Sequence, residues 1–222
     1  MATDFPNSPS NGDTHAGFTY NSTTATWETS VSSSSIDLLA DVDTSTAAPT
    51  TGQLLRWNGT NWAPYTPPLG EVDQWRLTAD LTSDADPVSS NLARVNDASF
   101  AKIGTGMSVS SGVWTFPSTG LWKVSFNVSC YFTVTDLAIR AIIQASSDSG
   151  VNWDNLANFK MGADYSTNNF SHGAGESFIN VTNTSTIKLR FSLTSISSGN
   201  QVIGEAARSD TYFSFMRLGD SQ

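Results

Sequence analysis

Apolar and polar residues alternate along much of the chain after residue 70. From Trp122 to Phe132 every second residue is apolar, and the stretch from 187 to 194 alternates in the same way. A period of two is typical of a β-strand that buries one face and exposes the other. The pattern therefore predicts two long strands, each with one face in a hydrophobic core.

The stretch from 211 to 218 is different because it is apolar on both faces. Phe213 and Phe215 share one face, while Tyr212, Met216 and Leu218 share the other. A strand with two apolar faces buries one in its own core and the other against a further surface. The pattern predicts that this strand takes part in self-assembly, with an obligate interface on the order of 2,000 Å² or more.

Shorter stretches of strand-like sequence lie between turns rich in Gly, Asn, Ser and Asp. Together with the longer strands they favour an all-β antiparallel sandwich of about ten strands. The shorter strands are expected near residues 75–81, 99–106, 112–116, 137–146, 156–162, 176–182 and 201–207.

The first 70 residues have another character. They hold six of the eight prolines and a run of four serines at 32–35, so we expect an extended arm at 1–70 and a folded domain at 71–222. Residues 18–23 are echoed by residues 55–60, which predicts two small hairpins, the second with a type I′ turn at Asn58-Gly59. A short helix at 35–41 is also compatible with the sequence, and a flexible spacer is the alternative for the whole arm. The aromatic residues expected to dock the arm are Phe18, Tyr20, Trp27, Trp57 and Trp62.

Charge and targeting signals exclude several classes of function. The chain carries 11 basic and 20 acidic residues, a net charge of −9, and its basic residues are scattered, so nucleic-acid binding is not expected. Cys130 is the single cysteine and is expected to pack as a small apolar residue. The N-terminus lacks the pattern of a signal peptide and no run of about 18 apolar residues occurs, so neither secretion nor membrane insertion is expected.

Catalytic and metal-binding motifs are sparse. His15 and His172 are the two histidines, the second in an expected loop, and no motif for a nucleophile, a metal or a phosphate accompanies them. We therefore expect no enzymatic activity, no cofactor and no metal. Asp80, Asp84 and Asp86 have a spacing that suits Ca²⁺, but solvated turns are the favoured interpretation.

Residues 146–153 resemble the Asp-box of sialidases, in which Asp148, Gly150 and Trp153 form a turn. A single copy predicts a turn without glycosidase activity. Exposed aromatic residues beside short polar ones also suit sugar binding, because sugar rings stack on aromatic faces. The alternative is that these residues only brace the loops. The candidates for glycan contact are Trp153, Asn155, Tyr165, Asn168 and His172.

The segment 116–126, Phe-Pro-Ser-Thr-Gly-Leu-Trp-Lys-Val-Ser-Phe, resembles a core segment of the complement C1q/tumour-necrosis-factor-like superfamily, and 210–218 resembles its last strand. The resemblance covers about 71–219 and implies a ten-stranded jelly roll that forms a homotrimer. It implies that Trp122, Phe126, Phe213 and Phe215 lie in the core or along the three-fold axis. The chain departs from the family in having no collagen-like stalk before the domain.

Residues 43–62 resemble a segment that recurs in tail fibres and structural proteins of phages, and 74–78, 85–87 and 104–107 resemble phage versions of the C1q-like domain. The resemblance implies a virion protein that is assembled in the host cytoplasm. We expect a homotrimeric fibre or knob, anchored to other virion proteins by its arm and attached to host-surface glycan by its head. A capsid decoration protein is the alternative, and a soluble carbohydrate-binding module or glycan hydrolase is a more distant one.

Overall fold

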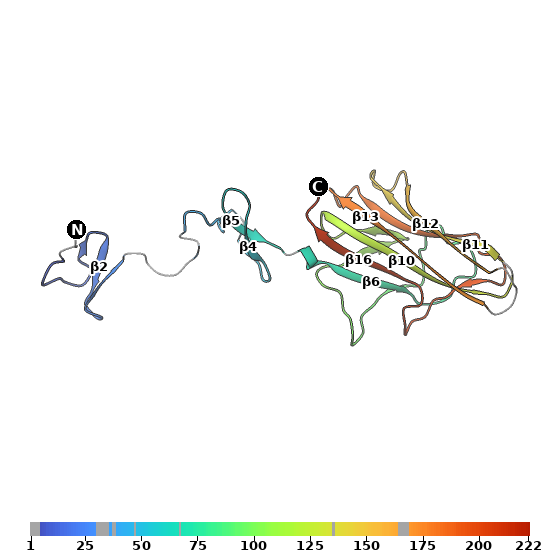
Figure 1. Cartoon of the computed structure of the whole chain (residues 1–222), viewed down its shortest axis with the longest axis horizontal. Helices are drawn as coiled ribbons and strands as arrows, with labels where there is room; N and C mark the ends of the chain where they lie inside the picture. The colour runs from blue at the N-terminus through green and yellow to red at the C-terminus, as the bar shows by residue number, and fades with distance from the viewer. Residues whose placement is uncertain are drawn as a thin grey trace. The chain divides into compact units, whose positions relative to one another are not determined.

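The computed structural model describes residues 5–29, 36, 39–46, 48–66, 68–134, 136–163 and 169–222, with the backbone alone at 29, 136 and 137. The chain forms two compact units, Met1–Tyr65 and Thr66–Gln222, each described by itself below. The division falls slightly before the predicted boundary at residue 70. Both units are built from antiparallel strands (Figure 1).

The first unit contains the two predicted aromatic hairpins. β2 (Phe18–Asn21) pairs with β3 (Thr26–Thr29), and the short β1 (Thr14–His15) extends this pair to three strands. The ring of Phe5 stacks on Trp27 with a centroid distance of 5.1 Å, and Tyr20 contacts the same tryptophan at 5.4 Å. An aromatic cluster therefore takes the place of a larger core in this small sheet.

The second hairpin joins β4 (Leu54–Trp57) to β5 (Trp62–Tyr65), with Trp57 directly opposite Trp62. Its turn differs from the predicted type I′, which needs positive φ at both central residues. Only Gly59 has positive φ, +104°, while the Asn58 side chain accepts hydrogen bonds from the backbone N–H groups of Thr60 and Asn61. Residues 35, 37 and 38 of the expected helix at 35–41 lie outside the described residues, while Ile36 is in 3₁₀ geometry and residues 39–41 form a bend and a turn.

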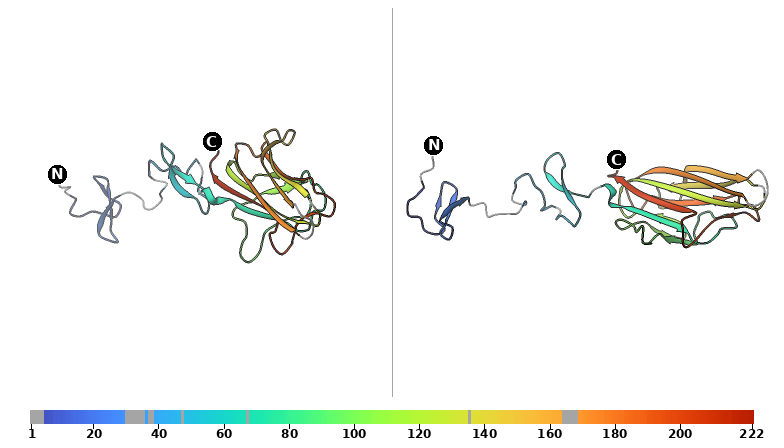
Figure 2. Two further views of the ribbon diagram at one scale, coloured as in Figure 1. Left: turned by 45° about the vertical axis from the view of Figure 1, so that its right-hand side comes forward. Right: turned by 60° about the horizontal axis from the view of Figure 1, so that its bottom comes forward.

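The second unit begins with the short 3₁₀ turn η2 (Pro68–Gly70) and is a sandwich of two antiparallel sheets. The six-stranded sheet has the order β13-β10-β16-β6-β7, with β15 pairing beside β10, and the five-stranded sheet has the order β12-β11-β14-β9-β8. Figures 1 and 2 show β16 between β10 and β6. The strands are β6 (Val72–Leu77), β7 (Leu92–Arg94), β8 (Ser108–Ser110), β9 (Val113–Thr115), β10 (Gly120–Phe132), β11 (Asp136–Ser146), β12 (Asp154–Ala163), β13 (Asn169–Val181), β14 (Lys188–Thr194), β15 (Gln201–Val202) and β16 (Tyr212–Gly219).

Successive strands cross between the two sheets, from β9 to β10, from β10 to β11, from β12 to β13 and from β13 to β14. This crossing pattern is that of a jelly roll. The predicted all-β class and antiparallel jelly-roll sandwich are therefore confirmed.

Aromatic side chains from both sheets fill the core. Phe126 stacks on Phe213 at 4.8 Å, and Trp114 contacts Phe215 at 5.0 Å and Phe191 at 5.9 Å. Full burial of side chains of this size stabilises by about 1.5–3 kcal/mol each. The largest fully buried residues are Trp114, Trp122, Phe116, Phe126, Phe132, Phe191, Phe213, Phe215, Leu77, Met107, Ile139 and Ile143.

One strand prediction was wrong, and two were right in place but not in length; the strand expected at 201–207 is only Gln201–Val202. Residues 99–106 form no named strand, because this segment is a loop that meets β6 through a single bridge between Ile103 and Val72. Conversely, the expected strand at 176–182 is much longer, since β13 begins at Asn169 and includes His172, which had been expected in a loop. Pairing along the whole length of β10 holds this glycine-containing sequence extended.

Two glycines of β13 leave room for side chains of the opposite sheet. A Cβ atom on Gly175 would lie 2.6 Å from the Phe159 ring, and one on Gly173 would lie 2.5 Å from the Met161 sulfur. Phe159 and Met161 belong to β12, so the missing side chains let the two sheets approach at this edge.

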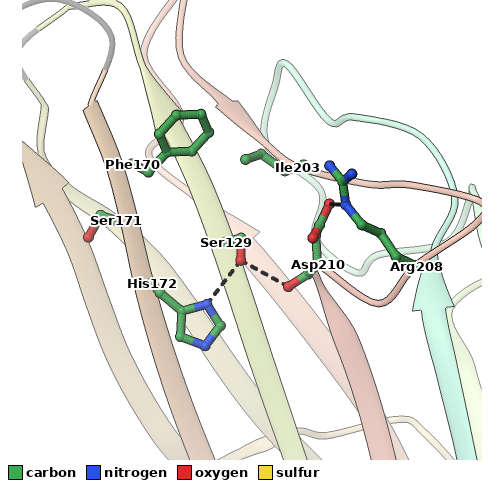
Figure 3. A pocket seen from close by; sticks show the side chains of 7 residues that line it. All are labelled: Ser129, Phe170, Ser171, His172, Ile203, Arg208 and Asp210. Atoms are coloured by element: carbon green, nitrogen blue, oxygen red, sulfur yellow. Dashed lines mark hydrogen bonds and ion pairs between the residues drawn. The ribbon is translucent and has the colours of Figure 1, made fainter.

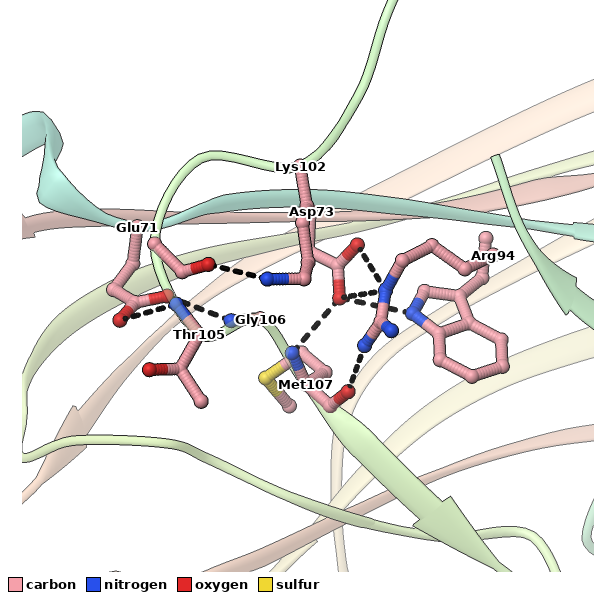
Figure 4. A network of polar contacts seen from close by, with 9 residues as sticks. Glu71, Asp73, Arg94, Lys102, Thr105, Gly106 and Met107 are labelled. Carbon is pink, nitrogen blue, oxygen red and sulfur yellow. Dashed lines mark hydrogen bonds and ion pairs between the residues drawn. The ribbon is translucent and has the colours of Figure 1, made fainter. Parts of the chain in front are cut away.

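A buried carboxylate ties the long loop before β8 to β6 (Figure 4). Asp73 is 1% exposed and accepts hydrogen bonds from Arg94 Nε at 3.0 Å, Trp75 Nε1 at 2.9 Å and the Met107 backbone N–H at 2.8 Å. Arg94 also donates to the Met107 carbonyl and lies over the Trp75 ring. Charge-assisted bonds in a protected site are among the strong ones, so this network fixes the loop.

Candidate functional site on the outer face of the six-stranded sheet

The outer face of the six-stranded sheet is formed by alternate residues of β10, β13 and β16. Strand alternation sends the even-numbered residues of β10 into the core, so its odd-numbered residues point outward. Direct pairing places Ser129 opposite His172 and Lys123 opposite both Phe178 and Met216. The outward positions are Leu121, Lys123, Ser125, Asn127, Ser129, Tyr131, Phe170, His172, Ala174, Glu176, Phe178, Asn180, Tyr212, Ser214, Met216 and Leu218.

This face carries apolar side chains that its own subunit leaves uncovered. Phe170 is 73% exposed, Phe178 is 59% exposed and Met216 is 37% exposed. Tyr131 contacts Phe170 at a centroid distance of 5.0 Å, which extends the apolar surface along the sheet. Exposed large apolar side chains on one face are a feature that interaction surfaces share.

The outer face of the five-stranded sheet is different. Its β11 and β14 place Arg140, Lys188 and Arg190 at outward positions together with the buried Ile142, Gln144 and Ser192, and the facing positions of β12 include Asn158 and Lys160. Exposed phenylalanines, in contrast, occur at outward positions of the six-stranded sheet, whose other outward residues are in part polar, and this face is called the apolar face below.

A hollow of about 220 Å³ lies on the apolar face (Figure 3). Ser129 stands at its centre, with its Oγ 2.9 Å from His172 Nδ1 and donating to the Asp210 backbone carbonyl at 2.9 Å. A neighbouring hollow of about 410 Å³ shares Phe170, Ile203 and Arg208 with it. The first hollow is lined by Ser129, Phe170, Ser171, His172, Ile203, Arg208 and Asp210.

The wall opposite His172 is the segment between β15 and β16. Arg76 anchors it by donating to the Ala206 carbonyl at 3.0 Å and pairing with Asp97 at 3.2 Å. Arg208 Nε lies 2.7 Å from Asp210, and this hydrogen bond raises the pKa of the Arg208 guanidinium above its ordinary value. The charge of Glu205, in the same segment, acts in the same direction, so this wall holds two acidic groups and one guanidinium.

The contact between Ser129 and His172 does not have the arrangement of an activated nucleophile. Such a serine gives its proton to the histidine, which a carboxylate orients from the other side. Here the Ser129 hydroxyl donates to the Asp210 carbonyl oxygen, so His172 Nδ1 is the donor to Ser129 Oγ. The absence of enzymatic activity remains a prediction.

The structure separates the residues predicted to contact glycan. Trp153 and Asn155 belong to the edge of the five-stranded sheet, where Arg190 lies 4.6 Å over the Trp153 ring and Asn155 accepts from Gln144 at 2.8 Å. His172 belongs to the other sheet, and Tyr165 and Asn168 lie outside the described residues. These residues therefore do not form one surface within the described part of the chain.

The Asp-box-like segment forms a bonded turn. Asp148 accepts from the Asn152 backbone N–H at 2.9 Å and from the Ser146 hydroxyl at 2.7 Å, and Trp153 Nε1 donates to the Gly150 carbonyl. The bond from Asn152, followed by the bond from Ser146, lowers the pKa of Asp148 to about 2.

The three aspartates with calcium-like spacing are used separately. Asp80 accepts from the Gly204 backbone N–H, Asp84 from the Ile196 backbone N–H, and Asp86 from the Ser192 hydroxyl. In the part of the chain that the structure covers, no three His, Cys, Asp or Glu residues are grouped so that they could hold a metal ion.

The residues predicted for core or assembly fall into two sets. Trp122, Phe126, Phe213 and Phe215 are all at most 1% exposed and lie in the core of their own subunit. Tyr212, Met216 and Leu218 occupy outward positions of β16. Of the predicted docking residues, Trp57 and Trp62 are 47% and 42% exposed, whereas Phe18, Tyr20 and Trp27 are in the aromatic environment of the first sheet.

Phe170 and Phe178 were not singled out from the sequence. Phe170, Ala174 and Phe178 recur on one face of β13, but this signal is obscured by His172 and Glu176 on the same face and by the Gly and Ser residues between them.

Comparison with solved structures finds tumour-necrosis-factor and complement domains. The Eiger TNF of S. frugiperda matches with a TM-score of 0.48 and 12% identity over 68% of this chain and 94% of that one. Murine APRIL at pH 5.0 matches with a TM-score of 0.45 and 11% identity, over 67% of this chain and 98% of that one. The globular domain of zebrafish complement 1qA matches with a TM-score of 0.43 and 10% identity, over 68% of this chain and 99% of that one. No protein-family model and no curated sequence matches the chain.

Among the described residues, no helix has the length and apolar character needed to span a bilayer.

Proposed function

We propose that this chain is a homotrimeric structural component of a phage particle. Its jelly roll associates with two further copies through the outer face of the six-stranded sheet, and its N-terminal unit docks on another virion protein. The observation that carries the proposal is the pair of exposed phenylalanines, Phe170 and Phe178, on a face whose counterpart on the other sheet is polar.

The size of the face suits a stable interface. The 13 residues of β10, at about 3.3 Å each, and three strands about 4.8 Å apart give a flat area of about 600 Å². The side chains that project from the sheet make the accessible surface larger than this flat area, toward the roughly 800 Å² that each partner buries in a standard interface. The resemblance of residues 116–126 and 210–218 to C1q/TNF-like domains favours three copies.

The place in a phage particle is supported by the resemblance of residues 43–62 to phage structural proteins. In this segment Trp57 and Trp62 pair across the hairpin with a centroid distance of 5.9 Å and remain 47% and 42% exposed. A hairpin of two short strands is marginal alone, so contact with a partner protein would stabilise it. We assign the role of docking surface to this tryptophan pair and the role of host-glycan attachment to the displayed jelly roll.

Assembly is tested by removing the apolar side chains of the face without touching the core. The double variant Phe170→Ser/Phe178→Ser is expected to be a folded monomer in light scattering coupled to size exclusion, while the unaltered chain is a trimer. Leu156→Ser is the matched control, because Leu156 is an exposed apolar residue of β12 on the other sheet. A double variant that remains trimeric would contradict the assigned face.

The virion role is tested on particles. Trp57→Ala/Trp62→Ala is expected to leave the jelly roll trimeric but absent from purified particles, because the docking surface is lost. Electron microscopy of labelled particles then distinguishes a fibre or tail position from a capsid position. Normal incorporation of this variant would contradict docking through the tryptophan pair, and loss of glycan-dependent adsorption without the protein would support attachment.

A further inference from the structure

The two aromatic hairpins of the N-terminal unit share one local plan. We call residues 9–29 the first module and residues 49–65 the second module. Each begins with a turn in which a side chain accepts a hydrogen bond from the backbone N–H three residues earlier, Asp13 at 2.7 Å and Gln53 at 2.8 Å. The two modules can therefore be compared position by position.

The hairpin turns of the two modules also correspond. Asn21 and Asn58 each accept hydrogen bonds from two following backbone N–H groups. The aromatic residue before each asparagine, Tyr20 or Trp57, lies directly opposite a tryptophan of the next strand. Tyr20 and Trp57 therefore occupy equivalent positions.

The modules differ at the outer edge of the hairpin. In the first module, the Tyr20 N–H donates to the Asp13 carbonyl at 2.8 Å, and the Tyr20 carbonyl accepts from the Gly12 N–H at 2.9 Å. The second module is three residues shorter between its turn glycine, Gly52, and its asparagine. Within its described residues, no strand takes the place of β1.

The backbone of β4 has groups that point away from β5. Trp62 of β5 donates to the Asp41 carbonyl at 2.7 Å and accepts from the Asp43 N–H at 2.8 Å, so its backbone groups point away from β4. Trp57 is paired with Trp62, so its own N–H and C=O point to the opposite, outer side. Alternation along an antiparallel strand gives Leu55 the same orientation.

This outer edge is open in the part of the chain that the structure describes. No described residue bonds the backbone N–H or C=O of Leu55 or Trp57, whereas the equivalent groups of Tyr20 are both bonded. Leu54 is 62% exposed and Trp57 is 47% exposed. An unpaired strand edge with exposed apolar side chains is a template for a further strand.

We propose that the second module docks by strand addition, in which an extended segment of a partner virion protein pairs with the outer edge of β4. This segment takes the place that residues 12–15 have in the first module. The inference rests on the proposed docking role of the tryptophan pair. Main-chain hydrogen bonds hold the added strand, and its alternate side chains lie beside Trp57, where an apolar residue fits.

The trimer itself argues against a second copy as the added strand. Two identical edges that pair with each other are related by a two-fold axis. A three-fold assembly presents three such edges, so pairing between copies leaves one edge open. A strand from a different chain can occupy all three edges alike.

Leu55→Pro tests the main-chain bonds. Proline removes the Leu55 N–H, which points to the open edge, and leaves the bonds between β4 and β5 in place. Leu55→Ala is the matched control, because it shortens the same side chain but keeps the N–H. The full-length variants are added to particles that lack the protein, and the bound amount is measured over a concentration series. Half-saturation is expected at a concentration at least about 10-fold higher for Leu55→Pro and within about 3-fold for Leu55→Ala.

Hydrogen exchange of the unaltered full-length chain tests the same edge without a substitution. In the free chain, the Trp57 amide is expected to exchange at least about 10-fold faster than the Tyr20 amide, which is bonded to Asp13. On the particle, the Trp57 amide is expected to become protected, while the Tyr20 amide changes little.

Equal binding of Leu55→Pro and the unaltered chain overturns strand addition, as does a Trp57 amide that exchanges alike in the free and the bound chain. Equal losses in Leu55→Pro and Leu55→Ala overturn it too, because side-chain contact then carries the binding. Assembly of free trimers that Leu55→Pro abolishes overturns the choice of a different chain as partner. Particles that bind none of the unaltered chain instead overturn the proposed function itself.

Discussion

Replacing Asp73 by asparagine tests how the loop before β8 is held. The substitution keeps the shape of the side chain but removes the charge that Arg94 pairs with, and it places an amide where an acceptor is needed. Removing one partner of a buried pair costs about 3–5 kcal/mol, and Arg94 is 29% exposed, so we expect a loss of about 2–4 kcal/mol. For a chain of this size that corresponds to a fall of about 4–16 °C in the midpoint of thermal unfolding.

The assay is thermal unfolding followed by near-ultraviolet circular dichroism at one protein concentration, which keeps assembly constant across variants. Asp154→Asn, at an exposed position of β12, is the control and is expected to stay close to the unaltered chain. The variants Arg94→Gln and Asp73→Asn/Arg94→Gln complete a double-mutant cycle, with an expected coupling energy of at least about 1 kcal/mol. A midpoint shift of less than about 2 °C for Asp73→Asn would refute the reasoning, because the network would then contribute under about 1 kcal/mol.

Three other predictions follow from the sandwich. Gly175→Ala is expected to lower the free energy of unfolding by about 1–3 kcal/mol, because its Cβ would meet the Phe159 ring. Gly219→Ala is the control and should change the unfolding midpoint little, because the space around Gly219 is open. Equal midpoints for the two variants would contradict the close approach of the sheets. Phe126→Ala is expected to cost about 3–5 kcal/mol in denaturant unfolding, and a loss below about 1 kcal/mol would remove it from the centre of the core. Because the pKa of Asp148 is lowered to about 2, the carboxylate contributes to stability above the ordinary aspartate range near pH 4, and this contribution is lost as pH falls toward 2. In Asp148→Asn the free energy of unfolding should therefore depend less on pH between about 4 and 2, with no change in its pH dependence above that window.

Strict alternation made much of the jelly roll predictable. The run that became β10 buries every second residue, and β14 does so except that Ser192 is also buried. A period of two therefore identifies each strand and the side that faces the core. β16 was predicted for the same reason, and alternation separated Phe213 and Phe215 from Tyr212 and Met216, but which of the two faces points into the core is known only from the structure.

The extent of β13, the hollow and the separation of the candidate glycan residues could not be predicted, because they depend on pairing between segments that are distant in the sequence. β13 reads as a loop around Gly173 and Gly175, yet it is extended because every residue from Asn169 to Val181 pairs with β10. The hollow depends on the segment before β16, which Arg76 holds through a contact 130 residues apart in the chain. Trp153 and His172 both looked like loop residues, and only the crossing of the strands shows that they belong to different sheets.

The mass of the purified chain in dilute solution at neutral pH tests the central claim most directly. Light scattering is expected to give three times the mass of one chain for the unaltered protein and the mass of one chain for folded Phe170→Ser/Phe178→Ser. A stable, well-folded monomer of the unaltered protein, with Phe170 and Phe178 in contact with water, would contradict the account.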